Sequence, residues 1–316
     1  MPTTVHPDHI LNELAGLWVS LAKEGQSNGG NGVLRACTMT LVVVAEVGDN
    51  WSGLGETLAA LMPEHPARAI SIHLSGSGDR ALSERVYSQC WMPFGQRRQI
   101  CCEQVELTAS DAALLDLPPV VRPLAVPDLP LILWCRSPRL LAMPEFRSIA
   151  SMAEKVIIDS EGRPLKDLTS LVPQGVLLAD LAWTRLTRWR ETLSQVFENK
   201  QNLAKIPALK TLTVCHTRAL VNSAAYLAAW ITAAVPSVKP TLNIDDHCDS
   251  LHVKLSGEDF EVHLERMQDR LAVTVNGMQN FTNLPMYSDY SLMREELGIV
   301  QPDRVFESVL RRAASV

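Results

Sequence analysis

The sequence predicts an α/β fold in two domains, and three observations support this class. Short, nearly continuous apolar runs such as 39–47 and 129–135 alternate with helix-length segments in the first half of the chain, which is typical of parallel strands buried on both faces. In the second half, three strand-like segments follow one another with hairpin-length separations, at 251–255, 260–264 and 271–275. A length of 316 residues also fits about two domains.

Changes in composition along the chain divide it into three predicted parts. Residues 1–35 combine a helix, in which apolar residues recur every three or four positions, with the glycine-rich stretch 25–32, which we expect to be a flexible linker. Residues 36–174 are predicted to form a mainly parallel α/β sandwich. Residues 175–316 are predicted to form a second α/β or α+β domain with an antiparallel portion.

The individual elements follow from the spacing of apolar residues and the positions of proline. Proline ends one predicted helix near residue 62 and another near 234, while Pro302 followed by Asp303 suits a helix start. The predicted helices cover 54–62, 112–117, 177–199, 219–234, 292–297 and 304–314, and the further predicted strands cover 68–74, 99–107, 155–159 and 212–215.

The composition argues against several classes of protein. A net charge of −6 and a pI near 5.8 disfavour nucleic-acid binding, which needs a positive field to neutralise phosphates. The longest apolar run, near 41–47, is far shorter than the roughly 20 residues that a membrane span needs. The N-terminus has no signal-peptide pattern. We therefore predict a cytoplasmic protein that binds neither nucleic acid nor membrane.

The seven cysteines are scattered along the chain, and their odd number fits reduced thiols better than a disulfide framework. Cys101 and Cys102 are adjacent in a strand-like stretch. Neighbours on a strand point to opposite faces, so a disulfide between these two would be strained, and pairing of either with Cys90 or Cys37 is geometrically easier. A redox role for Cys101 and Cys102 is one hypothesis, and two small apolar core residues are the alternative.

The most informative stretch is 180–193, because it places two tryptophans and three arginines in one segment of an acidic chain with few aromatic residues. On the predicted helix 177–199, Trp183 and Arg190 share a face, and Trp189 stacks over Arg185 four residues earlier. Tryptophan and arginine are frequent hot-spot residues at interfaces. The segment is therefore a candidate partner-binding surface, with a structural helix and buried tryptophans as the alternative. The candidate residues are Trp183, Arg185, Arg188, Trp189 and Arg190.

The remaining motifs do not form a catalytic site. Gly53 and Gly55 lie where a phosphate loop would follow a strand, but the rest of a dinucleotide fingerprint or P-loop is missing, so a glycine-eased turn is the simpler interpretation. The cluster 245–249 (Asp-Asp-His-Cys-Asp) has metal-ligand residue types, yet adjacent loop residues rarely converge on one ion. We therefore predict no catalytic residues, no cofactor and no metal site.

Several of these stretches together resemble one protein family. From about residue 40 to the C-terminus, the chain is similar to the OpcA family, the glucose-6-phosphate dehydrogenase assembly proteins of bacteria. The segment 180–190 (Asp-Leu-Ala-Trp-Thr-Arg-Leu-Thr-Arg-Trp-Arg) is the most specific match. The other matching stretches are 65–70, 89–93, 99–105, 127–134, 156–160 and 292–312.

The resemblance implies a non-catalytic assembly factor and allosteric activator. Such a protein would bind glucose-6-phosphate dehydrogenase, promote its active oligomer and support NADPH production in the oxidative pentose phosphate pathway. Thioredoxin-dependent redox control in some members would make thioredoxin a second partner. The family offers no catalytic residues to transfer to this chain.

The alternative hypothesis is an enzyme that acts on a sugar phosphate or nucleotide through the N-terminal sheet, since such sheets bind ligands at the carboxyl ends of their strands. Turnover of a pentose phosphate intermediate by the purified chain would favour this alternative. A third hypothesis, a redox sensor whose partner binding depends on thiol state, is compatible with the activator role, and a change in activation after thioredoxin or oxidant treatment would favour it.

Overall fold

The computed structural model describes residues 5–27, 33–91, 99–245, 250–299 and 301–315. The chain divides into two compact units. Unit 1 comprises Met1–Ile158, Leu171–Ala179 and Asp289–Gly298, and unit 2 comprises Asp159–Ser170, Asp180–Ser288 and Ile299–Val316. The predicted boundary at 174/175 treats each domain as one continuous stretch. In the structure, by contrast, residues 159–170 belong to unit 2 and residues 289–298 return to unit 1.

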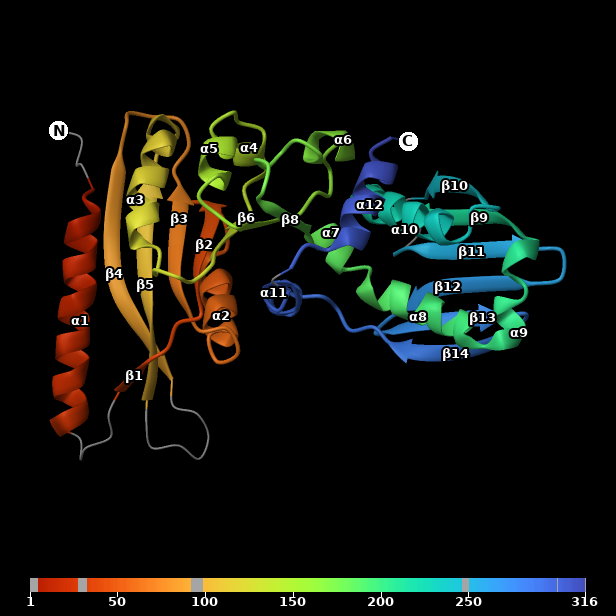
Figure 1. Cartoon of the computed structure of the whole chain (residues 1–316), viewed down its shortest axis with the longest axis horizontal. Coiled ribbons are helices and arrows are strands. Elements are labelled where there is room, and N and C mark those ends of the chain that lie inside the picture. The colour runs from red at the N-terminus through yellow and green to blue at the C-terminus, as the bar shows by residue number, and fades with distance from the viewer. Residues whose placement is uncertain (1–4, 28–32, 92–98, 246–249, 300, 316) are drawn as a thin grey trace. The chain divides into compact units, whose positions relative to one another are not determined.

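Unit 1 contains an eight-stranded, mainly parallel sheet (Figure 1), as predicted. The strand order is β1-β5-β3-β2-β6-β7-β8, and β4 pairs with β5. The pairs β1–β5, β5–β3, β3–β2, β2–β6 and β6–β7 are parallel, and β4–β5 is antiparallel. The strands are β1 (Val33–Arg35), β2 (Met39–Glu46), β3 (Ala67–Leu74), β4 (Leu82–Trp91), β5 (Gln99–Ala109), β6 (Leu131–Cys135), β7 (Lys155–Ile158) and β8 (Leu177–Asp180).

The helices of unit 1 differ from the prediction mainly in their bounds. The segment predicted as one helix at 112–117 is a 3₁₀ turn, η1 (Asp111–Asp116), followed by α3 (Leu117–Leu124). The helix α1 (Pro7–Ser27) contacts β4 and α3, and it runs alongside β4 in Figure 1. The other helices are α2 (Trp51–Leu61), α4 (Pro138–Leu141), α5 (Phe146–Ala150) and α11 (Asp289–Leu297).

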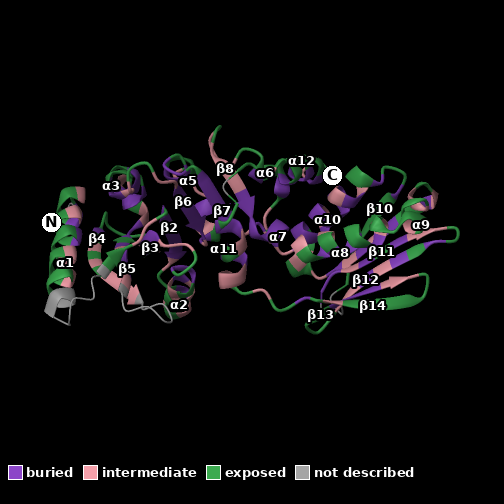
Figure 2. Ribbon diagram, turned by 60° about the horizontal axis from the view of Figure 1, so that its bottom comes forward, coloured by how far each residue is buried: buried purple, intermediate pink, exposed green. Residues whose placement is uncertain are grey.

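The core of unit 1 lies along β2, β3 and β6, where the ribbon in Figure 2 is mostly buried. All side chains from Leu41 to Ala45 are 0% exposed, which explains why β2 reads as a continuous apolar run. Thr40 is also buried, and its hydroxyl oxygen accepts a hydrogen bond of 2.9 Å from the amide of Val126. The buried polar group is thus paired.

Unit 2 is built on a six-stranded sheet with the order β10-β9-β11-β12-β13-β14. The β10–β9 pair is parallel, whereas the pairs β9–β11, β11–β12, β12–β13 and β13–β14 are antiparallel. The predicted antiparallel portion is therefore confirmed, with β10 and β14 as additional edge strands. The strands are β9 (Leu209–His216), β10 (Lys239–Ile244), β11 (His252–Gly257), β12 (Glu261–Met267), β13 (Arg270–Val275) and β14 (Met278–Asn283).

The alternation of side chains along these strands shows that the two faces of the sheet differ. Val253 and Leu255 of β11 and Val262 and Leu264 of β12 are buried, on the face against which α8 and α10 pack. The intervening residues point to the opposite, partly exposed face. The helical segments of unit 2 are α6 (Leu165–Leu168), α7 (Leu181–Thr184), α8 (Thr187–Glu198), α9 (Lys200–Leu203), η2 (Ile206–Ala208), η3 (Arg218–Leu220), α10 (Val221–Ala234) and α12 (Arg304–Ala313).

Within the described part of the chain, none of the helices combines the length and the apolar character that a membrane span requires.

Candidate functional site

The segment 180–193 does not form the single long helix predicted for 177–199. Residues 177–180 are strand β8, residues 181–184 are the single turn α7, and α8 begins only at Thr187. Asp180 fixes the start of α7, because its Oδ1 accepts a 3.0 Å hydrogen bond from the amide of Ala182. The hydroxyls of Thr184 and Thr187 bond to the carbonyls of Asp180 and Thr184, and such local bonds compete with a continuous helix.

Trp183 is a central packing residue of unit 2. Its side chain is 3% exposed, and its ring contacts Tyr226 and Phe306 with centroid separations of 6.0 Å each. The indole Nε1 donates a 3.0 Å hydrogen bond to Asp303, whose other oxygen caps α12 by accepting from the amide of Phe306. Trp183 therefore connects α7 to α10 and α12.

The predicted stack of Trp189 over Arg185 is replaced by a different pair. The guanidinium carbon of Arg190 lies 3.6 Å from the ring centroid of Trp183, within the range of a cation–π contact. Trp189 is itself 3% exposed. Arg185 forms an ion pair with Asp159, with 3.0 Å between Nη1 and Oδ1. The break between α7 and α8 changes the rotation between the two segments, and this explains the changed partners.

Arg188 is the most exposed of the five candidate partner-binding residues. Its side chain is 59% exposed, against 26% for Arg185, and it pairs with Glu191 one turn later on α8 at 2.9 Å. Both tryptophans are buried, while Arg185 and Arg190 contact groups of the same unit. The geometry thus gives four of the five residues structural contacts and leaves Arg188 facing solvent.

Asp180 is the centre of a buried hydrogen-bond network that the sequence did not indicate. Besides Ala182, its carboxylate accepts from the amide of Ser160 at 3.0 Å and from the hydroxyl of Tyr226 at 2.7 Å. Burial raises the pKa of Asp180 to about 6, against the effect of these donors. Nearby, burial also raises the pKa of Glu161, which accepts from the amides of Asn222 and Ser223. The network joins the loop after β7 to α7 and α10.

Replacing Asp180 by asparagine is expected to change how stability depends on pH. Because burial raises the pKa of Asp180 from an ordinary 3.8 to about 6, the folded protein keeps this proton between about pH 4 and 6 while the unfolded chain releases it. The native state therefore loses stability as the pH rises through this interval, by at most about 3 kcal/mol. Asparagine can still cap α7 but does not titrate. We expect the free energy of unfolding of Asp180→Asn, relative to wild type, to rise between pH 4 and 7 in urea denaturation. A difference that is independent of pH would contradict this.

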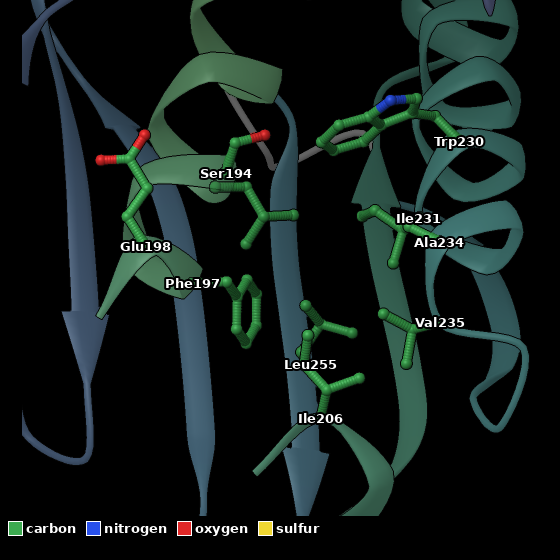
Figure 3. A pocket seen from close by; sticks show the side chains of 10 residues that line it. Ser194, Phe197, Glu198, Ile206, Trp230, Ile231, Ala234, Val235 and Leu255 are labelled. Atoms are coloured by element: carbon green, nitrogen blue, oxygen red, sulfur yellow. The ribbon is translucent and has the colours of Figure 1, made fainter. Parts of the chain in front are cut away.

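An apolar recess of about 260 Å³ lies beside α8 in unit 2. Figure 3 shows Phe197 of α8 and Trp230 and Ile231 of α10 directed into it, while the carboxylate of Glu198 points away. The recess is also lined by Leu193, Ser194, Ile206, Ala234, Val235 and Leu255. Its lining offers no cluster of titratable groups, so it suits an apolar side chain rather than a charged substrate.

The two candidate redox cysteines have different environments. Cys101 is disulfide-bonded to Cys90, its direct partner in the antiparallel β4–β5 register, which is one of the pairings left open by the sequence. Cys102 is a free, buried thiol, and burial raises its pKa to about 11, which disfavours the reactive thiolate. Cys37 is a partly exposed free thiol that donates to the carbonyl of Met39. If a redox couple exists here, Cys90–Cys101 supplies it; the redox role itself stays a prediction.

In a doubly wound sheet, a nucleotide binds outside the carboxyl ends of the parallel strands, and unit 1 has a sheet of this kind. Strand order reverses between β2 and β6, and doubly wound sheets bind ligands at this point. Here Glu46, the last residue of β2, pairs with Arg139 at 2.8 Å and also accepts from Ser137. Arg139 in turn binds both oxygens of Asp111 at 2.5 and 2.6 Å. Side chains from the end of β2 and from the segments after β5 and β6 thus place two carboxylates at this end of the sheet.

The start of α2 is also unlike a phosphate-binding loop. Gly53 and Gly55 lie inside α2 rather than in the turn predicted before it. Asn50 caps this helix by accepting from the amide of Gly53 at 3.0 Å, and a Cβ at position 53 would lie 2.6 Å from the Asn50 amide nitrogen. The cap therefore accounts for this glycine. The residues present do not fit a dinucleotide, because carboxylates repel a pyrophosphate and the helix cap uses the amide that would bind it.

The sequence cluster 245–249, whose residue types could bind a metal, lies mostly outside the described residues, since the structure describes Asp245 but not residues 246–249.

Comparison with known families decides the identity of the chain. Residues 59–172 match the profile described as the glucose-6-phosphate dehydrogenase subunit N-terminal domain, and residues 176–310 match that of the C-terminal domain, both of OpcA type. The chain belongs to the OpcA family. It is 25% identical over 190 residues to the OxPP cycle protein OpcA of Synechocystis sp., covering 58% of this chain and 39% of that protein. It is 26% identical over 182 residues to the protein of the same name from Nostoc punctiforme, covering 54% and 38%.

The chain therefore spans about four tenths of the length of these curated relatives. Among solved structures, biliverdin reductase from Synechocystis sp. PCC 6803 aligns with a TM-score of 0.45 and 12% identity, covering 88% of this chain and 96% of that one. A super-repressor mutant of Gal80p from Saccharomyces cerevisiae aligns with a TM-score of 0.46 and 6% identity, covering 84% and 83%.

The contacts of residues 180–190 show which residues of the candidate site were not predictable from the sequence. Asp159, Tyr226 and Asp303 all contact this segment, yet they lie far from it in the sequence. Asp303 had one usable signal, its place at a predicted helix start. Tyr226 and Asp159 had none, because only the folded chain brings them to residues 180–190.

Proposed function

We propose that this chain is a non-catalytic assembly factor and allosteric activator of glucose-6-phosphate dehydrogenase that promotes the active oligomer in the oxidative pentose phosphate pathway. The observation that carries the proposal is the ordered match of both OpcA-type domains, over residues 59–172 and 176–310. The relatives' names, which place them in the OxPP cycle, agree with it.

The carboxyl-end edge of the unit 1 sheet supports a non-catalytic role. The ion cluster of Glu46, Arg139 and Asp111 occupies the position at which a doubly wound sheet would bind a nucleotide. This disfavours the alternative of an enzyme that uses a nucleotide or sugar phosphate at that sheet. Turnover of a pentose phosphate intermediate by the purified chain alone would reverse that conclusion.

An activator can shift its target only by binding the active form more tightly than the inactive form. We propose that α8 supplies part of the contact, through the exposed Arg188. Arginine is a frequent hot-spot residue at interfaces. The contact would then require an acidic group on the dehydrogenase opposite Arg188.

The test is to mix the chain with the dehydrogenase from the same cell and to measure its rate and the mass of the complex together. A raised rate together with a complex of higher mass is expected. An unchanged rate with no complex would leave the proposal without support.

Reversing the charge at Arg188 is expected to weaken the complex. Arg188→Glu would place a carboxylate against the acidic partner group, and we expect about a tenfold higher Kd with a parallel loss of activation. Because the Arg188 side chain is 59% exposed, the fold should be unaffected. The triple alanine variant at Arg185, Arg188 and Arg190 is a poorer test, since Arg185 and Arg190 have partners within unit 2.

Arg311→Glu is the matched control, because Arg311 is an exposed arginine on another helix of unit 2, α12. It should leave Kd and activation near the wild-type values. Equal binding by Arg188→Glu and wild type would remove Arg188 from the contact while leaving the family function intact.

A further inference from the structure

The partly exposed face of the unit 2 sheet carries two histidines and a glutamate side by side. His252 lies on β11, and its direct partner in the antiparallel register is Glu265 on β12. His263 lies two residues before Glu265 and therefore on the same face. One potential ligand atom from each of the three side chains lies within 4.8 Å of the others. We propose that His252, His263 and Glu265 bind a zinc-type divalent transition-metal ion.

The strand pairing explains why these side chains can converge. Directly opposed residues on antiparallel strands have Cβ atoms about 4.5–5.5 Å apart, and residues at i and i+2 share a face. His252 Nδ1 is 4.0 Å from the carboxylate of Glu265, and the two imidazole centroids are 6.3 Å apart. Two ligand atoms on one tetrahedral zinc ion lie about 3.3 Å apart, given zinc–ligand distances of about 2.0–2.1 Å. Small side-chain rotations bring all three within range.

The donor set selects the class of metal. Two imidazole nitrogens and one carboxylate form a ligand set that zinc accepts, and such three-ligand sites leave the fourth position open. Calcium and magnesium prefer oxygen ligands throughout, so they would bind this site weakly. Cobalt(II) and nickel(II) also accept imidazole, which makes cobalt a useful spectroscopic probe.

The surroundings do not oppose a cation. Lys254 is the register partner of His263, but its ammonium is paired with Glu261 at 2.9 Å. On the other side, Cys215 of β9 is the register partner of His252 and is a free, partly exposed thiol. Both imidazoles and the carboxylate are partly exposed, so an ion can reach them from solvent.

Sequence reasoning did not predict this site, because 11 positions separate His252 from His263 and no recognised metal motif connects them. The interpretation depends on the register between β11 and β12. A shift of that register by one residue would move His252 to the opposite face from His263 and Glu265.

The experiment titrates the full chain with zinc chloride alone and measures binding by calorimetry after removal of trace metal with a chelator. We expect one equivalent to bind the wild type, and at least a tenfold loss of affinity in each of His252→Ala, His263→Ala and Glu265→Ala. Cobalt(II) should give the visible absorption of a tetrahedral site in the wild type but not in these three variants. Zinc should also raise the Tm of the wild type but not of the variants.

His9→Ala is the matched control, because His9 is an exposed histidine that lies near two carboxylates, Glu84 at 3.0 Å and Glu13 at 3.8 Å. It should bind zinc as the wild type does. Circular dichroism of each variant establishes that the fold is retained. Equal zinc binding by the wild type and all variants would mean an adventitious ion only and would overturn the proposal. Absence of zinc binding by the folded wild type would overturn it as well.

Discussion

Trp183→Ala is expected to lower the free energy of unfolding by about 3–5 kcal/mol, the range found when a large buried aromatic side chain is truncated. Trp183 is 3% exposed and packs on Tyr226 and Phe306. The truncation would leave a cavity among these rings and remove the donor to Asp303. It would also remove the surface on which the Arg190 guanidinium lies. Urea denaturation followed by circular dichroism provides the measurement.

Two further variants separate these contributions. Trp183→Phe keeps an aromatic ring but loses the hydrogen bond to Asp303, so we expect a smaller loss, of about 1–2 kcal/mol. Trp230→Ala removes a tryptophan that is only partly buried at the recess, and it should cost clearly less than Trp183→Ala. If Trp183→Ala and Trp230→Ala proved equally mild, Trp183 would not be a central packing residue.

A double-mutant cycle of Trp183→Leu and Arg190→Ala would measure the coupling between the aromatic ring and the guanidinium, because leucine offers no ring face; we expect the contact to contribute about 0.5–2 kcal/mol.

Those parts of the fold with strong local patterns were predictable from the sequence. The continuous apolar run of β2 reflects burial on both faces, and the hairpin spacing of β11 to β13 reflects an antiparallel sheet with one covered face. β4 was missed because its sequence, Leu-Ser-Glu-Arg-Val-Tyr-Ser-Gln-Cys-Trp, carries too many polar side chains to alternate clearly. The edge strand β10 was missed for a related reason. All six of its residues are exposed, so its sequence does not need the alternation of apolar and polar residues that marks a half-buried strand.

The helix predicted at 177–199 failed for a local reason that the apolar spacing conceals. Trp183, Leu186 and Leu193 recur as on one helix, yet the Asp180 cap and the hydroxyl bonds of Thr184 and Thr187 divide the segment into a strand and two helices. The contacts of Arg185 and Arg190 then depend on residues distant in the sequence. The residue types of the site were therefore predictable, but their partners were not.

The return of residues 289–298 to unit 1 was equally hidden from the sequence, and a buried ion pair holds it there. Glu296 of α11 and Lys155 of β7 are 5% and 6% exposed. The Lys155 ammonium donates to the Glu296 carboxylate at 2.7 Å and to its backbone carbonyl at 2.6 Å. Such a pair contributes little net stability relative to apolar residues of the same size, but it penalises the loss of either member heavily.

Lys155→Met is therefore expected to lower the free energy of unfolding by about 3–5 kcal/mol, because the Glu296 carboxylate would stay buried without the ammonium. The double variant Lys155→Met with Glu296→Leu should recover most of this loss, since both charges are then replaced by apolar groups. Arg294→Met is the control on the same helix: its pair with Glu64 is exposed, so stability should hardly change. Recovery in the double variant would show that the cost comes from the buried Glu296 charge once the Lys155 ammonium is removed. A double variant as unstable as the single one would instead show that the ion pair itself fixes α11 on unit 1.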